Sequence, residues 1–372
     1  MADYQVQLLD PYGTFLAQLD GFSSLDYARV VNDVGSLVIV IPSAYDRYLF
    51  AGTDVRRDNR IDVSRRIGLG QFQRDMDTQW LVTKGNKILN ERGERLTKIT
   101  CVDLMQLLNR RIVAYNSGTS QASKTAAADN VMKAIVRENM GSSATDTARD
   151  WTAYLTVEAD FGLGQSISKA FSRRKVLQIL KELANASYQA GTYIAFDIVA
   201  TSRTTMLFRT FAGQRGIDRR HPTGINPLIL GPDFGNLANV DRGYDHTNEI
   251  TYAYAGGQGE GASRIIGTSS DTTRIGGSPF GRIEGFVDAR TTSDATQVQD
   301  EARSLVKSSV PLNTFSGKIV DTQSTIYGLH YGFGDIVTAN FEGESINCYI
   351  DKIRVRVTQD GESVDSQLRA LI

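Results

Sequence analysis

The sequence predicts a strand-rich α+β fold, and its composition and turn pattern are the observations behind that prediction. The 372 residues include 34 glycines and only 7 prolines, together with 15 tyrosines and 15 phenylalanines. Many glycines and aromatic residues with few prolines are typical of strands joined by hairpins. A chain of this length exceeds one ordinary hydrophobic core, so we expect two or three domains.

Short alternating segments fill the first 100 residues. We predict strands at Tyr4–Leu9, Thr14–Leu19, Tyr27–Val31, Ser36–Ile41, Arg60–Ser64, Trp80–Lys84, Lys87–Glu91 and Leu96–Cys101. Turn-forming residues separate them, including Asn32–Gly35, Lys84–Asn86 and Glu91–Gly93. A short helix capped by Asp103 follows. Residues 1–115 are therefore expected to form a first β-domain.

Longer helical patterns mark the middle of the chain. The apolar spacing predicts helices over Thr125–Asn139 and Arg173–Gln189, followed by a hairpin of Tyr193–Val199 and Thr205–Phe211. Together they predict a compact α+β module over residues 116–240. In residues 241–372 we expect a glycine-rich segment, a helix over Ala295–Ser308 capped by Ser293 or Asp294, and strands at Phe315–Val320, Ile336–Phe341, Ser345–Ile350 and Lys352–Thr358.

The two ends of the chain share a weak internal similarity. Near the front, Asp58–Val63 leads to paired strands around Glu91–Glu94, and near the end Gly334–Val337 leads to paired strands and Gln359–Glu362. Two similar small barrels would explain this similarity, and so would coincidence between strand-rich segments. Both explanations stay open at this point.

Catalytic and metal-binding patterns give no positive signal. None of the three histidines, His221, His246 and His330, lies in a metal-ligand spacing. Cys101 and Cys348 are interpreted as buried free thiols rather than a disulfide pair. The chain carries 41 basic and 42 acidic residues, which does not favour a dedicated nucleic-acid binder. We expect no cofactor, no signal peptide and no membrane segment.

The segment Asn248–Arg264 is the most distinctive part of the sequence. A strand with Ile250, Tyr252 and Tyr254 runs into a glycine cluster, which is followed by Arg264. A phosphate loop would need a lysine after the glycines and a helix opening there, and neither is expected. We therefore interpret the segment as a structural joint or subunit interface, with candidate residues Asn248, Glu249, Gly256, Gly259, Glu260, Gly261 and Arg264. Glu260 and Arg264 are expected either to pair across the bend or to dock a neighbouring subunit.

Five segments in order resemble the siphophage Gp37-like tail proteins, which are similar to the baseplate hub and tail-tip hub proteins of long-tailed bacteriophages. These segments are Tyr27–Ser36, Asp103–Ile112, Asn248–Arg264, Arg282–Arg290, and Gly334–Val337 with Ile350–Ile353. The resemblance implies two tube-like β-barrels in each chain, with the α+β module between them. It also implies a homotrimer that forms a pseudo-sixfold ring.

The same resemblance implies a structural role in the virion rather than an enzymatic one. The ring would join the sixfold tail tube to a threefold tip and let DNA pass without reading its sequence. Its expected partners are the distal tail protein, the tape measure protein and a tip or fibre protein, after assembly in the host bacterial cytoplasm. The alternatives are a receptor- or carbohydrate-binding module of a tail tip and, third, an enzyme that attacks the cell wall.

Overall fold

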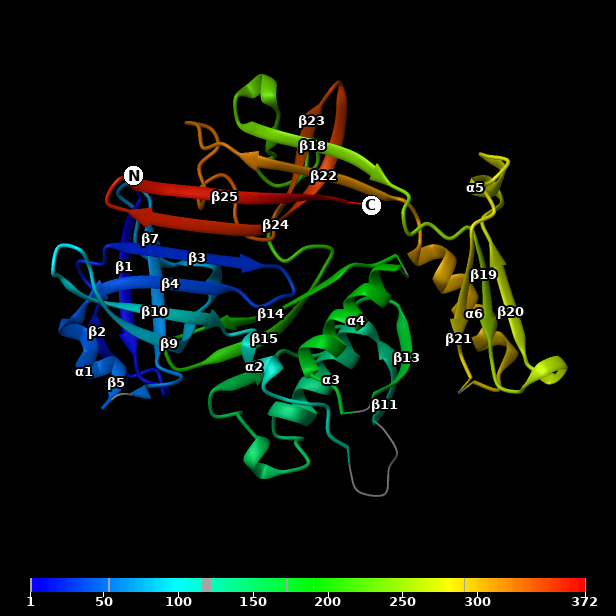
Figure 1. Ribbon diagram of the computed structural model, residues 1–372, viewed down its shortest axis with the longest axis horizontal. Coiled ribbons are helices and arrows are strands. Elements are labelled where there is room, and N and C mark those ends of the chain that lie inside the picture. The colour runs from blue at the N-terminus through cyan, green and yellow to red at the C-terminus, as the bar shows by residue number, and fades with distance from the viewer. Residues whose placement is uncertain are drawn as a thin grey trace. The chain divides into compact units, whose positions relative to one another are not determined.

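The computed structural model describes residues 2–52, 54–115, 122–171, 173–189, 191–290 and 292–371 (Figure 1). Contacts divide the chain into two compact units. Unit 1 comprises Met1–Val240 together with Gly317–Leu371, and unit 2 comprises Asp241–Ser316. The last part of the chain, from Gly317, therefore belongs to the same unit as the first 240 residues.

The N-terminal part of unit 1 consists of antiparallel strands with short helical turns. Its elements are β1 (Asp3–Leu9), β2 (Phe15–Gln18), β3 (Ser24–Val30), β4 (Ser36–Pro42), α1 (Asp46–Leu49), β5 (Phe50–Ala51), β6 (Asp54–Val55), β7 (Arg60–Arg66), β8 (Gln73–Arg74), β9 (Trp80–Leu89), β10 (Arg95–Asp103) and α2 (Gln106–Asn109). Alternate residues of β3 and β4 are buried, as a sheet with one covered face requires.

One predicted turn in this region is wrong. The segment Lys84–Asn86 lies within the continuous strand β9, and Gly85 pairs with Ile99 of β10. A β-carbon on Gly85 would lie 2.8 Å from the ring of Phe50, so this glycine allows close packing and not a turn. The predicted turn at Glu91–Gly93 is confirmed, since Gly93 has a φ of 78° and donates its backbone N–H to Asn90.

The C-terminal strands pair directly with the N-terminal ones. Strands β22 (Leu312–Ile319), β23 (Ile336–Phe341), β24 (Glu344–Thr358) and β25 (Gly361–Ala370) end the chain, and β24 pairs antiparallel with β3. Figure 1 shows β24 beside β3, and the strand order along the main sheet is β18-β22-β25-β24-β3-β4-β10-β9-β7-β1-β2. Among the described residues this path joins the two ends of the chain without closing into a barrel.

The two strands predicted at Ser345–Ile350 and Lys352–Thr358 are one strand, β24, with a register shift between Ile350 and Lys352. A bulge bends a strand without ending it, which explains why the sequence looked interrupted. Short strands β16 (Asp218–Arg219) and β17 (Ile229–Leu230) pair parallel with β23.

The α+β module follows α2 along the chain. It contains β11 (Ala122–Ala127), α3 (Ala128–Met140), β12 (Leu155–Val157), β13 (Ser166–Phe171), α4 (Val176–Gln189), β14 (Ile194–Ala200) and β15 (Met206–Ala212). The predicted hairpin is confirmed as β14 and β15. The helix predicted over Thr125–Asn139 begins at Ala128 instead of Thr125, because residues 122–127 form a strand that pairs with β13.

Unit 2 is a three-stranded sheet covered by a helix. Its elements are β19 (Tyr252–Gly256), β20 (Ile266–Ser270), α5 (Thr272–Gly276), β21 (Glu284–Asp288) and α6 (Ala295–Ser308), and β18 (Leu237–Asp245) leads into it. The predicted helix α6 is confirmed, with Asp294 accepting the backbone N–H of Thr296 as its cap. Its buried residues Val298, Ala302 and Val306 pack on Ala253 and Ala255 of β19.

Both cysteines are free and buried, which confirms that expectation. Burial raises the pKa of Cys101 and raises that of Cys348 to about 12, so both thiols stay protonated near neutral pH. No helix among the described residues is long and apolar enough to cross a membrane.

Candidate functional sites: a glycine corner and a polar joint

The residues singled out from the sequence fall at the two ends of strand β19. Gly256, Gly259, Gly261 and Arg264 lie where β19 ends and the chain turns back toward β20, and we call residues 256–264 the glycine corner. A short 3-10 turn, Gly261–Ser263, stands where a phosphate-binding loop would need an α-helix to begin. Asn248 and Glu249 precede β19 and are not part of this corner.

Arg264 holds the glycine corner together. Its guanidinium donates to the carbonyl oxygens of Gly256 at 3.0 Å and Gly257 at 3.1 Å, and to the carboxylate of Asp288 at 2.7 Å. Gly256 and Asp288 are register partners of the parallel strands β19 and β21. The β-carbon of any other residue at Gly256 would overlap the guanidinium, so the glycine makes room for the arginine.

The expected pairing of Glu260 with Arg264 is wrong. Arg264 takes Asp288, which lies 24 residues further along the chain, as its carboxylate partner. Glu260 is exposed. Its backbone carbonyl accepts two hydrogen bonds from Ser263, one from the backbone N–H at 3.1 Å and one from the side-chain hydroxyl at 2.8 Å. Docking of a neighbouring subunit by Glu260 stays a prediction.

Two further glycines let helix α6 approach the sheet closely. A β-carbon on Gly257 would lie 2.6 Å from a methyl group of Val298, and one on Gly267 would lie 2.8 Å from the backbone of Gln299. Gln299 in turn accepts the backbone N–H of Thr268 at 3.1 Å. The glycine cluster therefore serves a bend and a tight helix–sheet contact, which are structural tasks.

Glu249 belongs to a second cluster at the start of β19. It accepts hydrogen bonds from His246 at 2.8 Å and from Arg274 at 3.0 Å. The hydrogen bond from His246, followed by that from Arg274, lowers the pKa of the Glu249 carboxyl. Asn248 is exposed in the preceding turn.

The sheet of unit 2 also has an aromatic face that our sequence interpretation missed. Tyr252 and Tyr254 of β19 lie opposite Glu284 and Phe286 of β21. The Arg282 guanidinium lies 3.8 Å from the centre of the Tyr252 ring and donates to the Tyr254 hydroxyl at 2.9 Å. Phe286 remains 57% exposed. The alternating tyrosines of β19 were visible in the sequence. The register that places them opposite β21 could not be predicted from it.

In unit 1, a buried polar joint connects the first β-domain to the α+β module. Arg29 of β3 donates through Nε to Asp103 of β10 at 2.9 Å, and through Nη1 and Nη2 to Asp197 of β14 at 3.1 and 2.5 Å. Arg215 donates to the same Asp197 at 2.7 Å. We call Arg29, Asp103, Asp197 and Arg215 the polar joint. Arg29 is 1% exposed, so its charge depends on partners within the protein and not on water.

Within the polar joint the charges of Arg29 and Asp197 sustain each other, whereas burial outweighs Arg29 at Asp103 and raises the pKa of that carboxyl. Burial alone would lower the pKa of the Arg29 guanidinium, but the carboxylates of Asp197 and Asp103 outweigh it and raise that pKa. Burial alone would raise the pKa of the Asp197 carboxyl, but Arg29 and Arg215 outweigh it and lower that pKa. Asp197 therefore stays ionised near neutral pH, and its contribution to stability is lost only as the pH falls through its lowered pKa.

The turn after β3 adds backbone contacts to the same connection. Asn32, with a φ of 58°, accepts the backbone N–H of Phe196 at 2.7 Å. A β-carbon on Gly35 would lie 2.6 Å from the carbonyl oxygen of Ala28. The segment Tyr27–Ser36 thus carries an arginine, an asparagine and a glycine that each have a structural task at this connection.

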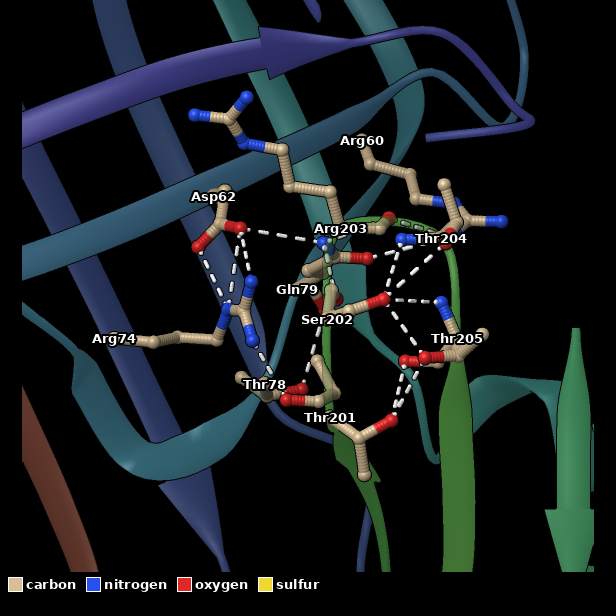
Figure 2. Close-up of polar contacts among 11 residues, drawn as sticks. Arg60, Asp62, Arg74, Thr78, Gln79, Thr201, Ser202, Arg203, Thr204 and Thr205 are labelled. Atoms are coloured by element: carbon tan, nitrogen blue, oxygen red, sulfur yellow. Dashed lines mark hydrogen bonds and ion pairs between the residues drawn. The ribbon is translucent and has the colours of Figure 1, made fainter. Parts of the chain in front are cut away.

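The tip of the β14–β15 hairpin lies in a polar seat formed by the first β-domain (Figure 2). Gln79 donates to the carbonyl oxygen of Arg203 at 3.2 Å, and Arg60 donates to the same oxygen at 3.3 Å. Arg74 forms a bidentate pair with Asp62, at 2.9 and 2.7 Å, and donates to the carbonyl of Ala200 at 2.6 Å. Backbone carbonyls of the hairpin thus accept hydrogen bonds from two arginines and a glutamine of the first β-domain. These hydrogen bonds fix the α+β module on that domain.

Among the described residues, no group of three or more His, Cys, Asp or Glu side chains is arranged to hold a metal ion. What the glycine corner and the polar joint do chemically is hold secondary-structure elements in fixed relation within each unit.

Comparison with solved structures defines the class of fold. A tail protein from Neisseria meningitidis MC58 aligns with a TM-score of 0.56 at 14% identity, covering 98% of this chain and 96% of that one. The 43 kDa tail protein of prophage MuSo2 from Shewanella oneidensis gives 0.54 at 12% identity, with 98% of both chains covered. The prophage tail protein gp18 from Listeria monocytogenes EGD-e gives 0.52 at 10% identity, with 98% and 94% covered. The fold is thus one that bacteriophage tail proteins adopt.

The chain belongs to the Siphovirus ReqiPepy6 Gp37-like protein family, which it matches over residues 5–368. The resemblance drawn from the sequence is therefore confirmed. No curated protein matches the chain.

Proposed function

We propose that this chain is the hub of a siphophage tail tip, a non-enzymatic structural protein of the virion. The observation that carries the proposal is the pairing of β24 with β3, which joins the strands of both chain ends into one sheet. When each subunit contributes two strand-rich halves, three subunits place six such halves around a ring. A threefold assembly can then match a sixfold tube. The family membership and the tail-protein fold support the same role.

In this proposal each part of the chain has a task. Residues 1–115 and the C-terminal strands of residues 241–372 supply the two tube-like β-barrel domains of a subunit, whose joined sheet is open in the single chain. Residues 116–240 form the module that braces the first of these domains through the polar joint. Three subunits form a pseudo-sixfold ring, assembled in the host cytoplasm, through which DNA passes. The neighbouring proteins are the distal tail protein, the tape measure protein and a tip or fibre protein.

The proposal predicts a ring-shaped trimer. Native mass spectrometry of the full chain at micromolar concentration should show about three times the subunit mass of 40.9 kDa. Electron microscopy of the same sample should show a ring with an open centre. A protein that stays monomeric over this range, and is absent from the tail tips of assembled virions, would refute the hub assignment.

The aromatic face favours a second candidate, a receptor- or carbohydrate-binding module. Phe286 is exposed, and Arg282 contacts Tyr252 and Tyr254 beside it. Aromatic side chains of this kind stack on sugar rings while neighbouring polar groups hydrogen-bond to the sugar hydroxyls. For this candidate we expect the purified chain to bind cell-wall glycans of the host. Phe286→Ala should reduce that binding at least tenfold, while the exposed Phe234→Ala in unit 1 should not. Equal binding by all three proteins would exclude the aromatic face as the site.

A further inference from the structure

The joined sheet of unit 1 has one buried face and one open face. Residues at alternate positions of its central strands are exposed or half-buried, while their neighbours in sequence are buried. The pairing registers place these side chains on a single surface, which we call the open sheet face. It consists of Lys84, Asn86, Lys98, Thr100, Ser36, Val38, Val40, Asp26, Ala28, Val30, Lys352, Arg354, Arg356, Ser363, Asp365, Gln367 and Lys318.

The open sheet face is basic although the whole chain is not. It carries six basic side chains and two acidic ones, whereas the full sequence has 41 basic and 42 acidic residues. The two acidic residues are shared among several cations: Arg354 and Arg356 lie 2.5 and 3.6 Å from Asp26, and Lys318 lies 2.7 Å from Asp365. Within the part of the chain that the structure describes, Lys84, Lys98 and Lys352 form no ion pair with a carboxylate.

The side chains between these charges are short. Ala28, Ser36 and Val38 line a shallow depression of about 330 Å³ together with Lys352 and Arg354. None of the large hydrophobic side chains exposed in the described residues lies on this face. The apolar side chains on this face are small or half-buried, namely Ala28, Val30, Val38 and Val40, and the face offers none of the aromatic anchors that are enriched at protein interfaces.

We propose that the open sheet face contacts the phosphate backbone of double-stranded DNA without reading its sequence. A smooth face with lysines and arginines around a centre of small residues offers electrostatic contact to phosphates. A sheet surface that is several strands wide is too broad to enter a DNA groove and reach the base edges, so the contact carries no base specificity. The inference rests on the proposed passage of DNA through the hub and names the surface that meets it.

The proposal is tested by DNA binding of the full chain in its native oligomeric state. Two 30-base-pair duplexes of unrelated sequence should bind with equal affinity, and the affinity should fall steeply between 50 and 200 mM salt. The double variant Lys98→Gln/Lys352→Gln should bind roughly tenfold or more weakly at 50 mM salt, with a salt slope smaller by about two. The double variant Arg57→Gln/Lys307→Gln removes the same charge from exposed positions outside this face and should bind like the wild type.

Three outcomes of the binding experiment would overturn the proposal: the absence of salt-dependent DNA binding, an equal loss in both double variants, and a preference for one duplex. Measuring the oligomeric state of each variant separates this proposal from the hub assignment. A ring-shaped trimer that does not bind DNA retains the hub and rejects the open sheet face as a DNA contact. Loss of the trimer in Lys98→Gln/Lys352→Gln alone would assign the face to contacts between subunits and also reject the proposal.

Discussion

Arg29→Ala is expected to destabilise unit 1 by about 3–5 kcal/mol, because it leaves the buried carboxylates of Asp103 and Asp197 without their shared partner. The change also removes the donor to the Met76 carbonyl, which Arg29 contacts at 2.7 Å. Uncompensated buried charge is among the costliest consequences of a single substitution. Urea unfolding of the full chain measures the loss as a shift of the transition midpoint.

Tryptophan fluorescence is a suitable probe for this experiment. The only two tryptophans in the sequence, Trp80 and Trp151, both lie in unit 1, so their signal follows that unit. Arg57→Ala is the control, since its side chain is 82% exposed and a surface arginine contributes within about 0.5 kcal/mol. Arg29→Lys keeps the charge but cannot reproduce the bidentate contact, so it should fall between the two. Equal stability of Arg29→Ala and Arg57→Ala would show that the polar joint contributes nothing.

Gly259→Val is expected to destabilise unit 2 by about 3 kcal/mol or more. Gly259 has a φ of 106°, where a β-branched residue is strained, and its β-carbon would lie 2.5 Å from the carbonyl oxygen of Ser263. The glycine corner would have to open, and with it the Arg264 contacts to Gly256 and Asp288. Hydrogen exchange read by mass spectrometry should accelerate roughly a hundredfold in β19, β20 and α6.

The matched control is Gly276→Val at the end of α5. That glycine has no positive φ, and no heavy atom lies within 4 Å of a β-carbon built on it. Its exchange pattern should stay close to that of the wild type, and tryptophan fluorescence should be unchanged in both variants because unit 2 has no tryptophan. Wild-type exchange in Gly259→Val would contradict the structural role of the corner.

Secondary-structure elements could be predicted from the sequence where all the residues that define an element lie in one short stretch of chain. Helix α6 has its cap and its buried stripe within 15 residues, and its bounds are those predicted. The β14–β15 hairpin is equally local. Thr125 was misassigned because strand β13, which pairs with its segment, lies more than 40 residues away.

The candidate sites depended on contacts between distant residues, and these could not be predicted. Arg264 finds Asp288 through a parallel strand register, so the nearer Glu260 was the misleading choice. Arg29 finds Asp197 at a separation of 168 residues. The basic open sheet face was hidden by a nearly neutral composition, because only strand pairing brings Lys98 and Lys352 onto one surface.

The pairing of β24 with β3 also sets the order of events during synthesis. The Asp26–Arg354 pair in these strands spans 328 residues of chain. At a translation rate of 5–20 residues per second, β3 is made roughly 15–65 s before its partner. During that interval one edge of β3 has no native neighbour, and an unpaired edge is a template for other strands. Nascent chains on neighbouring ribosomes of one messenger RNA all expose this edge of β3 at the same time. Misassembly between such chains would therefore begin at β3.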